Sequence, residues 1–166
     1  PVRNSQLATR NSHSMKPPPP LVLVLWCHFS DELVATTYIV KLREQGIQVK
    51  LLGLEGRRLR GAHGLTLLPD FTLDQAWQRV TMVRAIILPF ETARLLHYLN
   101  DPRLFNLLQQ ALDHGATLLL KRNTACEVLA QLAERLERDV GSLQKACEEN
   151  DQLSSLIFQI QKENLL

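Results

Sequence analysis

Short apolar runs alternate with amphipathic segments between residues 21 and 120. The first run, LVLVLW at Leu21–Trp26, is apolar at every position, which is typical of a central parallel strand covered by helices on both faces. Four later runs predict further strands at Ile47–Leu54, Leu65–Pro69, Arg84–Pro89 and Ala116–Leu120. Because such strands need crossover connections, the pattern predicts an α/β fold. We expect a doubly wound, mostly parallel five-stranded sheet in a three-layer sandwich of the flavodoxin-like kind.

Helix signals occupy the gaps between these runs. Ser30 is expected to cap a helix that ends at Gly46, and Asp101 is expected to cap another that ends at Gly115. Pro102 suits the first turn of the second helix. The apolar positions of both helices recur every three or four residues. The buried stripes are expected at Ala35, Tyr38, Ile39 and Leu42, and at Leu104, Leu107, Leu108 and Ala111.

A change in composition after Leu120 marks a C-terminal helical extension. From Thr124 to Leu166 the chain has no proline and is rich in strong helix formers. An apolar seam spaced by three or four residues must be buried against something. Packing on the protein's own sheet is favoured for Leu129–Leu136, whereas a partner helix is favoured for the second half. The expected partner-binding residues are Leu153, Leu156, Ile157, Phe158 and Ile160.

The chain divides into three parts. Residues 1–20 are expected to be a disordered leader, native or introduced for expression, that ends in a polyproline spacer. Residues 21–138 are expected to form the α/β domain, and residues 139–166 a helical interaction tail. The expected location is the cytoplasm, or an organelle stroma or matrix if the leader is a processed transit segment.

Composition excludes several classes of function. The net charge of +2 provides no strong field to attract nucleic acid or an anionic membrane. The basic group Arg57, Arg58 and Arg60 stands between glycines and is typical of a solvated loop. The three cysteines are widely spaced and odd in number, which argues against a disulfide framework and favours a reducing compartment. We expect a soluble protein with no cofactor, no metal ion, no nucleic-acid partner and no membrane insertion.

Four sequence segments are similar to those of a known family: LREQGIQVKLLGLEG, HGLTLLPDFTLDQA, RAIILP and DPRLFNLLQQALDHGATLLL. Their order resembles the PfpI/ThiJ superfamily of the glutamine-amidotransferase-like fold across Leu21–Ala130. The resemblance implies a flavodoxin-like fold. For a complete member it also implies thiol chemistry, built on a cysteine at a sharp strand-to-helix turn.

The catalytic features of that family are not matched here. Its acidic residue falls on Val34, its Pro-Gly-Gly turn falls on the PFE of residues 89–91, and its cysteine falls on or beside Arg122. Cys126 comes four residues later, inside the predicted helix. A nucleophile turn needs small neighbours that permit strained backbone, and the KRN of residues 121–123 is too bulky for it.

Two functions follow from these observations. The leading hypothesis is a degenerate, non-catalytic PfpI-like domain, a pseudoenzyme. It would act as a protein-interaction or oligomerisation module that binds a protein partner, or a second copy of itself, through its C-terminal helices. The alternative is a small thiol-dependent enzyme, or a redox- or stress-responsive protein, that uses Cys27 with His28 or Glu32. Residues at strand ends line the ligand sites of open parallel sheets. Cys27 and His28, however, are expected to point to opposite sides.

Overall fold

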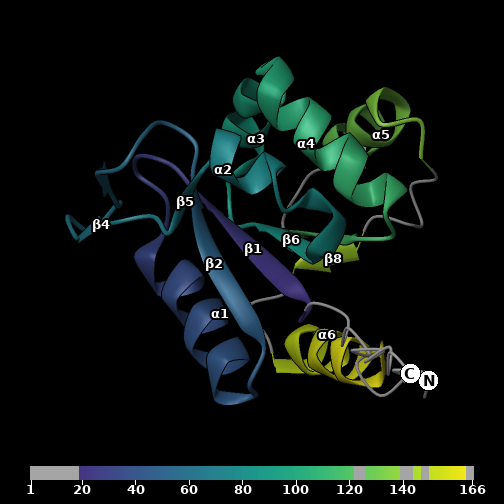
Figure 1. The fold of residues 1–166 in the computed structure, drawn as a ribbon. Helices are drawn as coiled ribbons and strands as arrows, with labels where there is room; N and C mark the ends of the chain where they lie inside the picture. The colour runs from purple at the N-terminus through teal and green to yellow at the C-terminus, as the bar shows by residue number, and fades with distance from the viewer. Residues whose placement is uncertain (1–18, 122–125, 139–143, 147–149, 164–166) are drawn as a thin grey trace, which may run out of the picture.

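A parallel sheet forms the centre of the computed structural model, which describes residues 19–121, 126–138, 144–146 and 150–163 (Figure 1). The strands are β1 Leu21–Trp26, β2 Gln48–Gly53, β3 Leu59–Arg60, β4 Thr66–Leu67, β5 Phe71–Thr72, β6 Val83–Leu88, β7 Thr117–Lys121 and β8 Gln144–Ala146. The main sheet has the order β5-β2-β1-β6-β7-β8, with every pairing parallel, and β3 pairs antiparallel with β4 in a separate hairpin. The predicted α/β, flavodoxin-like fold class is confirmed.

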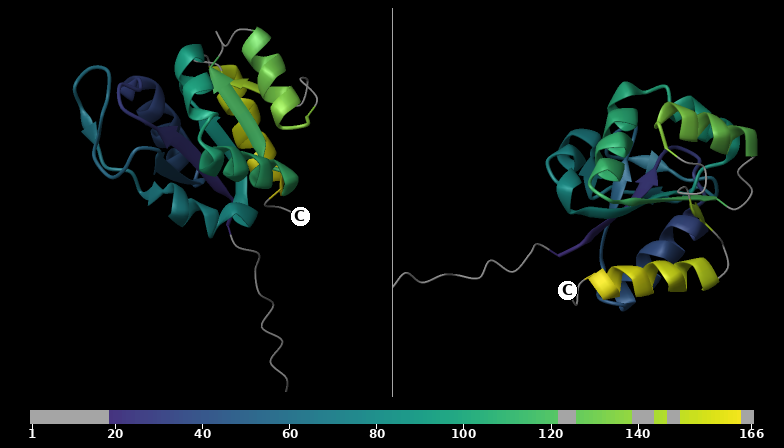
Figure 2. Two further views of the ribbon diagram at one scale, coloured as in Figure 1. Left: turned by 90° about the horizontal axis from the view of Figure 1, so that it is seen from above. Right: turned by 90° about the vertical axis from the view of Figure 1, so that its right-hand side faces the viewer.

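Helices cover both faces of the sheet (Figure 2). They are α1 Glu32–Glu44, α2 Leu73–Trp77, the 3-10 helix η1 Val80–Met82, α3 Thr92–Tyr98, α4 Pro102–Asp113, α5 Cys126–Arg135 and α6 Asn150–Glu163. Alternate residues of β1 enter two separate core clusters. Leu21, Leu23 and Leu25 pack with α2, α3, α4 and α5, whereas Val22 and Val24 pack with α1 and α6. None of the helices in the described residues is long and apolar enough to cross a membrane.

The helix boundaries follow their capping residues. Asp101 caps α4 through its side chain, with Pro102 in the first turn, as predicted. The cap of α1 is Asp31 rather than Ser30, because the Asp31 carboxylate accepts hydrogen bonds from the N–H groups of Leu33 and Val34. The predicted stripe of α4 is fully buried, and so is that of α1 except for the half-buried Ile39.

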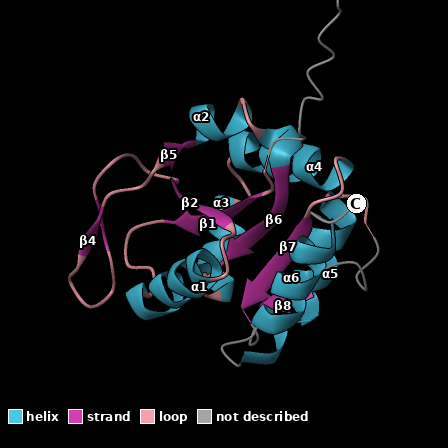
Figure 3. Cartoon of the chain, turned by 60° about the horizontal axis from the view of Figure 1, so that its bottom comes forward, coloured by secondary structure: helices cyan, strands magenta, loops and turns pink. Residues whose placement is uncertain are grey.

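The strand expected at Leu65–Pro69 does not join the main sheet. Its residues Thr66 and Leu67 pair with β3 instead, and the hairpin stands away from the layers (Figure 3). Two neighbours explain the change. Pro69 has no N–H for a ladder, and the Asp70 carboxylate accepts the hydrogen bond of the Leu51 N–H at 2.8 Å. The next two residues form β5, which takes the edge beside β2.

The C-terminal region belongs to the domain itself. The sequence predicted only helices after Leu120, but β8 extends the sheet by pairing with β7. The first half of the predicted seam packs in the first core cluster as favoured, with Leu129, Leu132 and Leu136 buried. Leu156 and Ile160 of α6 are each only 2% exposed and lie in the second cluster with residues of β1 and α1. The structure therefore places these two side chains in the protein's own core, where the sequence had favoured a partner helix.

Candidate functional site

The carboxyl end of the sheet brings together residues that follow β1, β2 and β6. Cys27 follows β1 directly and is fully buried. Its Sγ lies 3.0 Å from the Ser30 Oγ. The Tyr98 side chain of α3 packs against the core cluster that contains Cys27. Burial raises the pKa of the Tyr98 phenol far above its usual range, and the neighbouring Cys27 and Glu55 side chains add to this rise. The thiol thus lies in the core, with the Ser30 hydroxyl as its hydrogen-bond partner.

Phe90, in the turn after β6, packs in the same core cluster as Cys27. The side chain is 2% exposed and its ring centroid lies 5.6 Å from that of Tyr98. This is the turn where the family resemblance implied Pro-Gly-Gly and open backbone donors. The second position of this turn is instead a buried aromatic side chain. Glu91, the next residue, is exposed.

His28 forms hydrogen bonds with residues of neighbouring loops, and no hydrogen bond between its side chain and the Cys27 thiol is found among the described residues. Its N–H donates to the Glu55 carboxylate at 2.8 Å, and its ring Nδ1 accepts the Arg60 N–H at 3.2 Å. The Arg94 guanidinium donates to the His28 carbonyl. The His28 imidazole is therefore engaged with the hairpin backbone at Arg60 and not with the neighbouring thiol.

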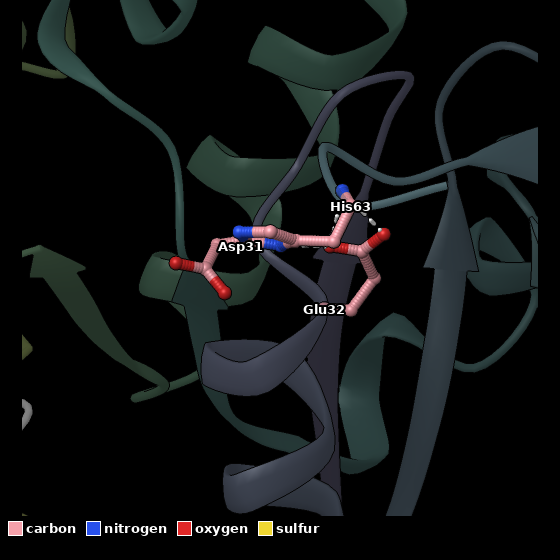
Figure 4. A group of neighbouring side chains, drawn as sticks. All are labelled: Asp31, Glu32 and His63. Carbon is pink, nitrogen blue, oxygen red and sulfur yellow. Dashed lines mark hydrogen bonds and ion pairs between the residues drawn. The ribbon is translucent and has the colours of Figure 1, made fainter. Parts of the chain in front are cut away.

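Glu32 is a buried carboxylate at the start of α1 (Figure 4). One oxygen, Oε1, accepts the N–H groups of His63 at 2.8 Å and Leu65 at 3.1 Å. The other, Oε2, lies 2.8 Å from the His63 Nδ1. Burial opposes ionisation of Glu32, but these hydrogen bonds outweigh it and lower the pKa of the carboxyl to about 2. The same contact raises the pKa of the His63 imidazole.

The group Asp31, Glu32 and His63 has ligand atoms within 4.8 Å of one another, which is compatible in distance with a metal ion. The donors around it suggest another role. Asp31 caps α1, and the Glu32 carboxylate already accepts three different N–H groups from the 61–65 turn. The positive end of the α1 dipole also disfavours a cation at this position. The arrangement fits a clamp that fixes this turn, and Gly61 fits the clamp because a Cβ there would lie 2.2 Å from the Glu32 Oε1.

Of the other positions implied by the family resemblance, the structure describes the side chain of Val34 but not those of Arg122 and Cys126. Val34 lies half-buried on α1 and packs against the second core cluster. Arg122 lies outside the described residues. Cys126 is the first residue of α5, and its side chain is not among those described.

The expected partner-binding residues are also divided. Leu156 and Ile160 are core residues, Ile157 is partly buried, and Phe158 is 70% exposed. The side chain of Leu153 lies outside the described residues. Among those of the five whose side chains are described, Phe158 is the one that is largely exposed.

The sequence reasoning missed Tyr98, Glu55 and the 61–65 turn. Tyr98 meets Cys27 across 71 positions of the chain, and Glu32 meets His63 across 31. No local spacing signals contacts of this range. The local clue was the pair Ala62 and His63 between two glycines, which predicts a tight turn. The N–H groups of such a turn can donate to a buried carboxylate.

Comparison with solved structures gives the class of the fold. DJ-1beta of Drosophila melanogaster superposes with a TM-score of 0.64 at 18% identity, over 88% of this chain and 90% of that one. A DJ-1 superfamily protein of Salmonella typhimurium gives 0.61 at 16% identity, over 88% and 90%. A putative protease I of Bacteroides thetaiotaomicron gives 0.61 at 12% identity, over 86% and 98%.

The chain thus has the three-layer α/β architecture of these proteins. More particularly, it has a DJ-1/ThiJ/PfpI-like fold, as the sequence resemblance implied. No family model matches the sequence, and no curated protein matches it either. At identities of 12–18% the likeness defines the fold alone.

Proposed function

We propose that this chain is a non-catalytic PfpI-like domain that acts as a protein-interaction module. The observation that carries the proposal is the closed carboxyl end of the sheet. Cys27 is fully buried, its Sγ lies 3.0 Å from the Ser30 Oγ, and it belongs to the core cluster that also contains Phe90 and packs against Tyr98. A thiol must be accessible to attack a substrate, and a fully buried side chain is not.

Alkylation of the native protein tests the absence of thiol chemistry. Iodoacetamide at neutral pH should leave Cys27 unmodified in the folded chain and modify it fully after unfolding. Mass spectrometry of the peptide that contains Cys27 separates this thiol from Cys126 and Cys147. Modification of native Cys27 at the rate of a free thiol would overturn the proposal and favour the enzyme.

The interaction surface that we propose is the outer face of α6. Phe158 is 70% exposed there, while Leu156 and Ile160 hold the opposite face of the helix in the core. A large aromatic side chain on a rigid helix is a frequent anchor of protein interfaces. The core contacts fix α6 in place, so the aromatic ring is presented without a cost in ordering.

The test uses point variants rather than truncation, because removing residues after 142 would also remove β8 and core side chains of α6. Immobilised full chain is incubated with cell extract or with a second copy of itself. Phe158→Ser should abolish capture of a specific partner or self-association, whereas Gln161→Ser, an exposed site on the same helix, should not. Equal binding by the wild type and Phe158→Ser would exclude this surface.

A further inference from the structure

The hairpin of residues 56–69 carries an unusual concentration of positive charge. It contains Arg57, Arg58 and Arg60 and no aspartate or glutamate. We call this segment, which includes β3 and β4, the basic hairpin. The two acids that flank it in the sequence have other partners: Glu55 accepts the His28 N–H, and Asp70 pairs with Arg43 and Lys50.

The three arginines of the basic hairpin are exposed and unpaired. Their guanidinium groups make no hydrogen bond, ion pair or ring contact within the described residues. Every other arginine with a described side chain has a partner, such as Asp70 for Arg43 and the ring of Phe71 for Arg79. Unpaired guanidinium groups are well suited to bind phosphate oxygens in a bidentate manner.

Exposed leucines accompany these charges. Leu65 is 59% exposed and Leu68 is 69% exposed. Phe29, 60% exposed, is joined to the base of the hairpin because its N–H donates to the Arg60 carbonyl at 2.7 Å. A surface that offers both cationic and apolar groups fits a ligand with anionic headgroups above an apolar layer.

The basic hairpin is held rigidly although it projects. Leu59 is fully buried in the second core cluster, and the Trp26 indole N–H lies 3.5 Å from its carbonyl. The Glu32 carboxylate holds the turn through the N–H groups of His63 and Leu65. The hairpin extends beyond the three layers in every view that shows it (Figures 1, 2 and 3). A projecting tip reaches a flat surface without hindrance from the body of the protein.

From these observations we infer that the basic hairpin docks the protein peripherally on an anionic phospholipid surface. Arg57, Arg58 and Arg60 bind headgroup phosphates, while Leu65 and Leu68 enter the boundary between headgroups and acyl chains.

Charges on the far side of the molecule do not oppose this contact, because screening at physiological salt acts over about 8 Å. The basic hairpin contains no phenylalanine, tyrosine or tryptophan, and Phe29 at its base is a single exposed ring, so the surface has no row of rings on which successive nucleic-acid bases could stack. This surface is separate from the outer face of α6, so the inference does not depend on the proposed function.

Flotation of the full chain with lipid vesicles tests the inference. The protein should float with vesicles of phosphatidylcholine and phosphatidylserine but not with phosphatidylcholine alone, and added salt should release it. The double variant Arg57→Gln/Arg58→Gln should bind roughly 25-fold more weakly, at about fivefold per arginine. The matched control Arg79→Gln/Lys162→Gln removes the same charge elsewhere on the surface and should bind like the wild type.

The apolar contribution is tested separately. Leu65→Ser/Leu68→Ser should weaken binding to anionic vesicles, whereas Val40→Ser, an exposed apolar site on α1, should not. The inference is wrong if the wild type fails to float with anionic vesicles, or if the arginine variant and its control float equally. A change in oligomeric state on Leu65→Ser/Leu68→Ser, with lipid binding unaltered, would instead assign the basic hairpin to contacts between copies of the chain.

Discussion

The role of α6 in the core predicts a large loss of stability when Leu156 is shortened. Leu156→Ala removes three carbon atoms from a side chain that is 2% exposed. At about 0.8 kcal/mol for each buried carbon, the lost transfer free energy is roughly 2.4 kcal/mol. The cavity left between the sheet, α1 and α6 adds to this, so we expect a total of about 3 kcal/mol, within the range seen for buried leucines.

Urea unfolding followed by circular dichroism measures this change. Phe158→Ala, on the outer face of the same helix and 70% exposed, is the matched control and should alter the free energy of unfolding by no more than about 0.5 kcal/mol. A loss below about 1 kcal/mol for Leu156→Ala would show that α6 does not pack on the sheet in solution. The C-terminal seam would then be free for a partner, as the sequence alone suggested.

Three further predictions concern the start of α1, the 61–65 turn and the cap of α4. Gly61→Ala should displace the Glu32 carboxylate, which its Cβ would meet at 2.2 Å, and should speed amide hydrogen exchange at His63 and Leu65. Because the pKa of Glu32 falls from 4.5 to about 2 on folding, its stabilising effect is present above pH 4.5 and is lost as the pH falls toward 2. Urea midpoints of Glu32→Gln should therefore vary less than those of the wild type over this range. Asp101→Ala removes the cap of α4 and should cost about 1 kcal/mol in urea unfolding, and no loss would contradict the capping role.

Local signals were sufficient to predict the centre of the fold. The unbroken apolar run of β1 identifies a strand covered on both faces, and alternate residues do enter two different core clusters. The cap at Asp101 and the stripe of α4 depend only on neighbours within a few turns of one helix. Such features can be read from sequence because the contacts that stabilise them are set by the helical or strand period.

The errors arose where distant parts of the chain compete with local preference. Gln144–Ala146 consists of good helix formers, yet it pairs with the exposed edge of β7, because an unpaired strand edge offers a full row of hydrogen bonds. The seam of α6 has the correct spacing, but spacing alone cannot tell a partner from the protein's own sheet. The Cys27 cluster likewise depends on Tyr98, whose helix is placed only by the complete fold.

The buried position of Cys27 shows how this fold can form without an accessible thiol. The architecture needs only apolar strands and helices of suitable spacing, whereas a reactive thiol needs exposure and small neighbours. Phe90 and Tyr98 meet the packing requirement and remove the exposure. We therefore expect substitutions at these two aromatic residues to alter the accessibility of Cys27.

The most direct test of this closure is the rate of Cys27 alkylation as a function of urea, below the unfolding transition. If Phe90 and Tyr98 seal the thiol as part of the core, the free energy of exposing it should equal the free energy of global unfolding and should fall with urea at the same slope. Alkylation that proceeds at a rate independent of urea would instead reveal a local opening at the carboxyl end of the sheet. That result would contradict a closed, non-catalytic site.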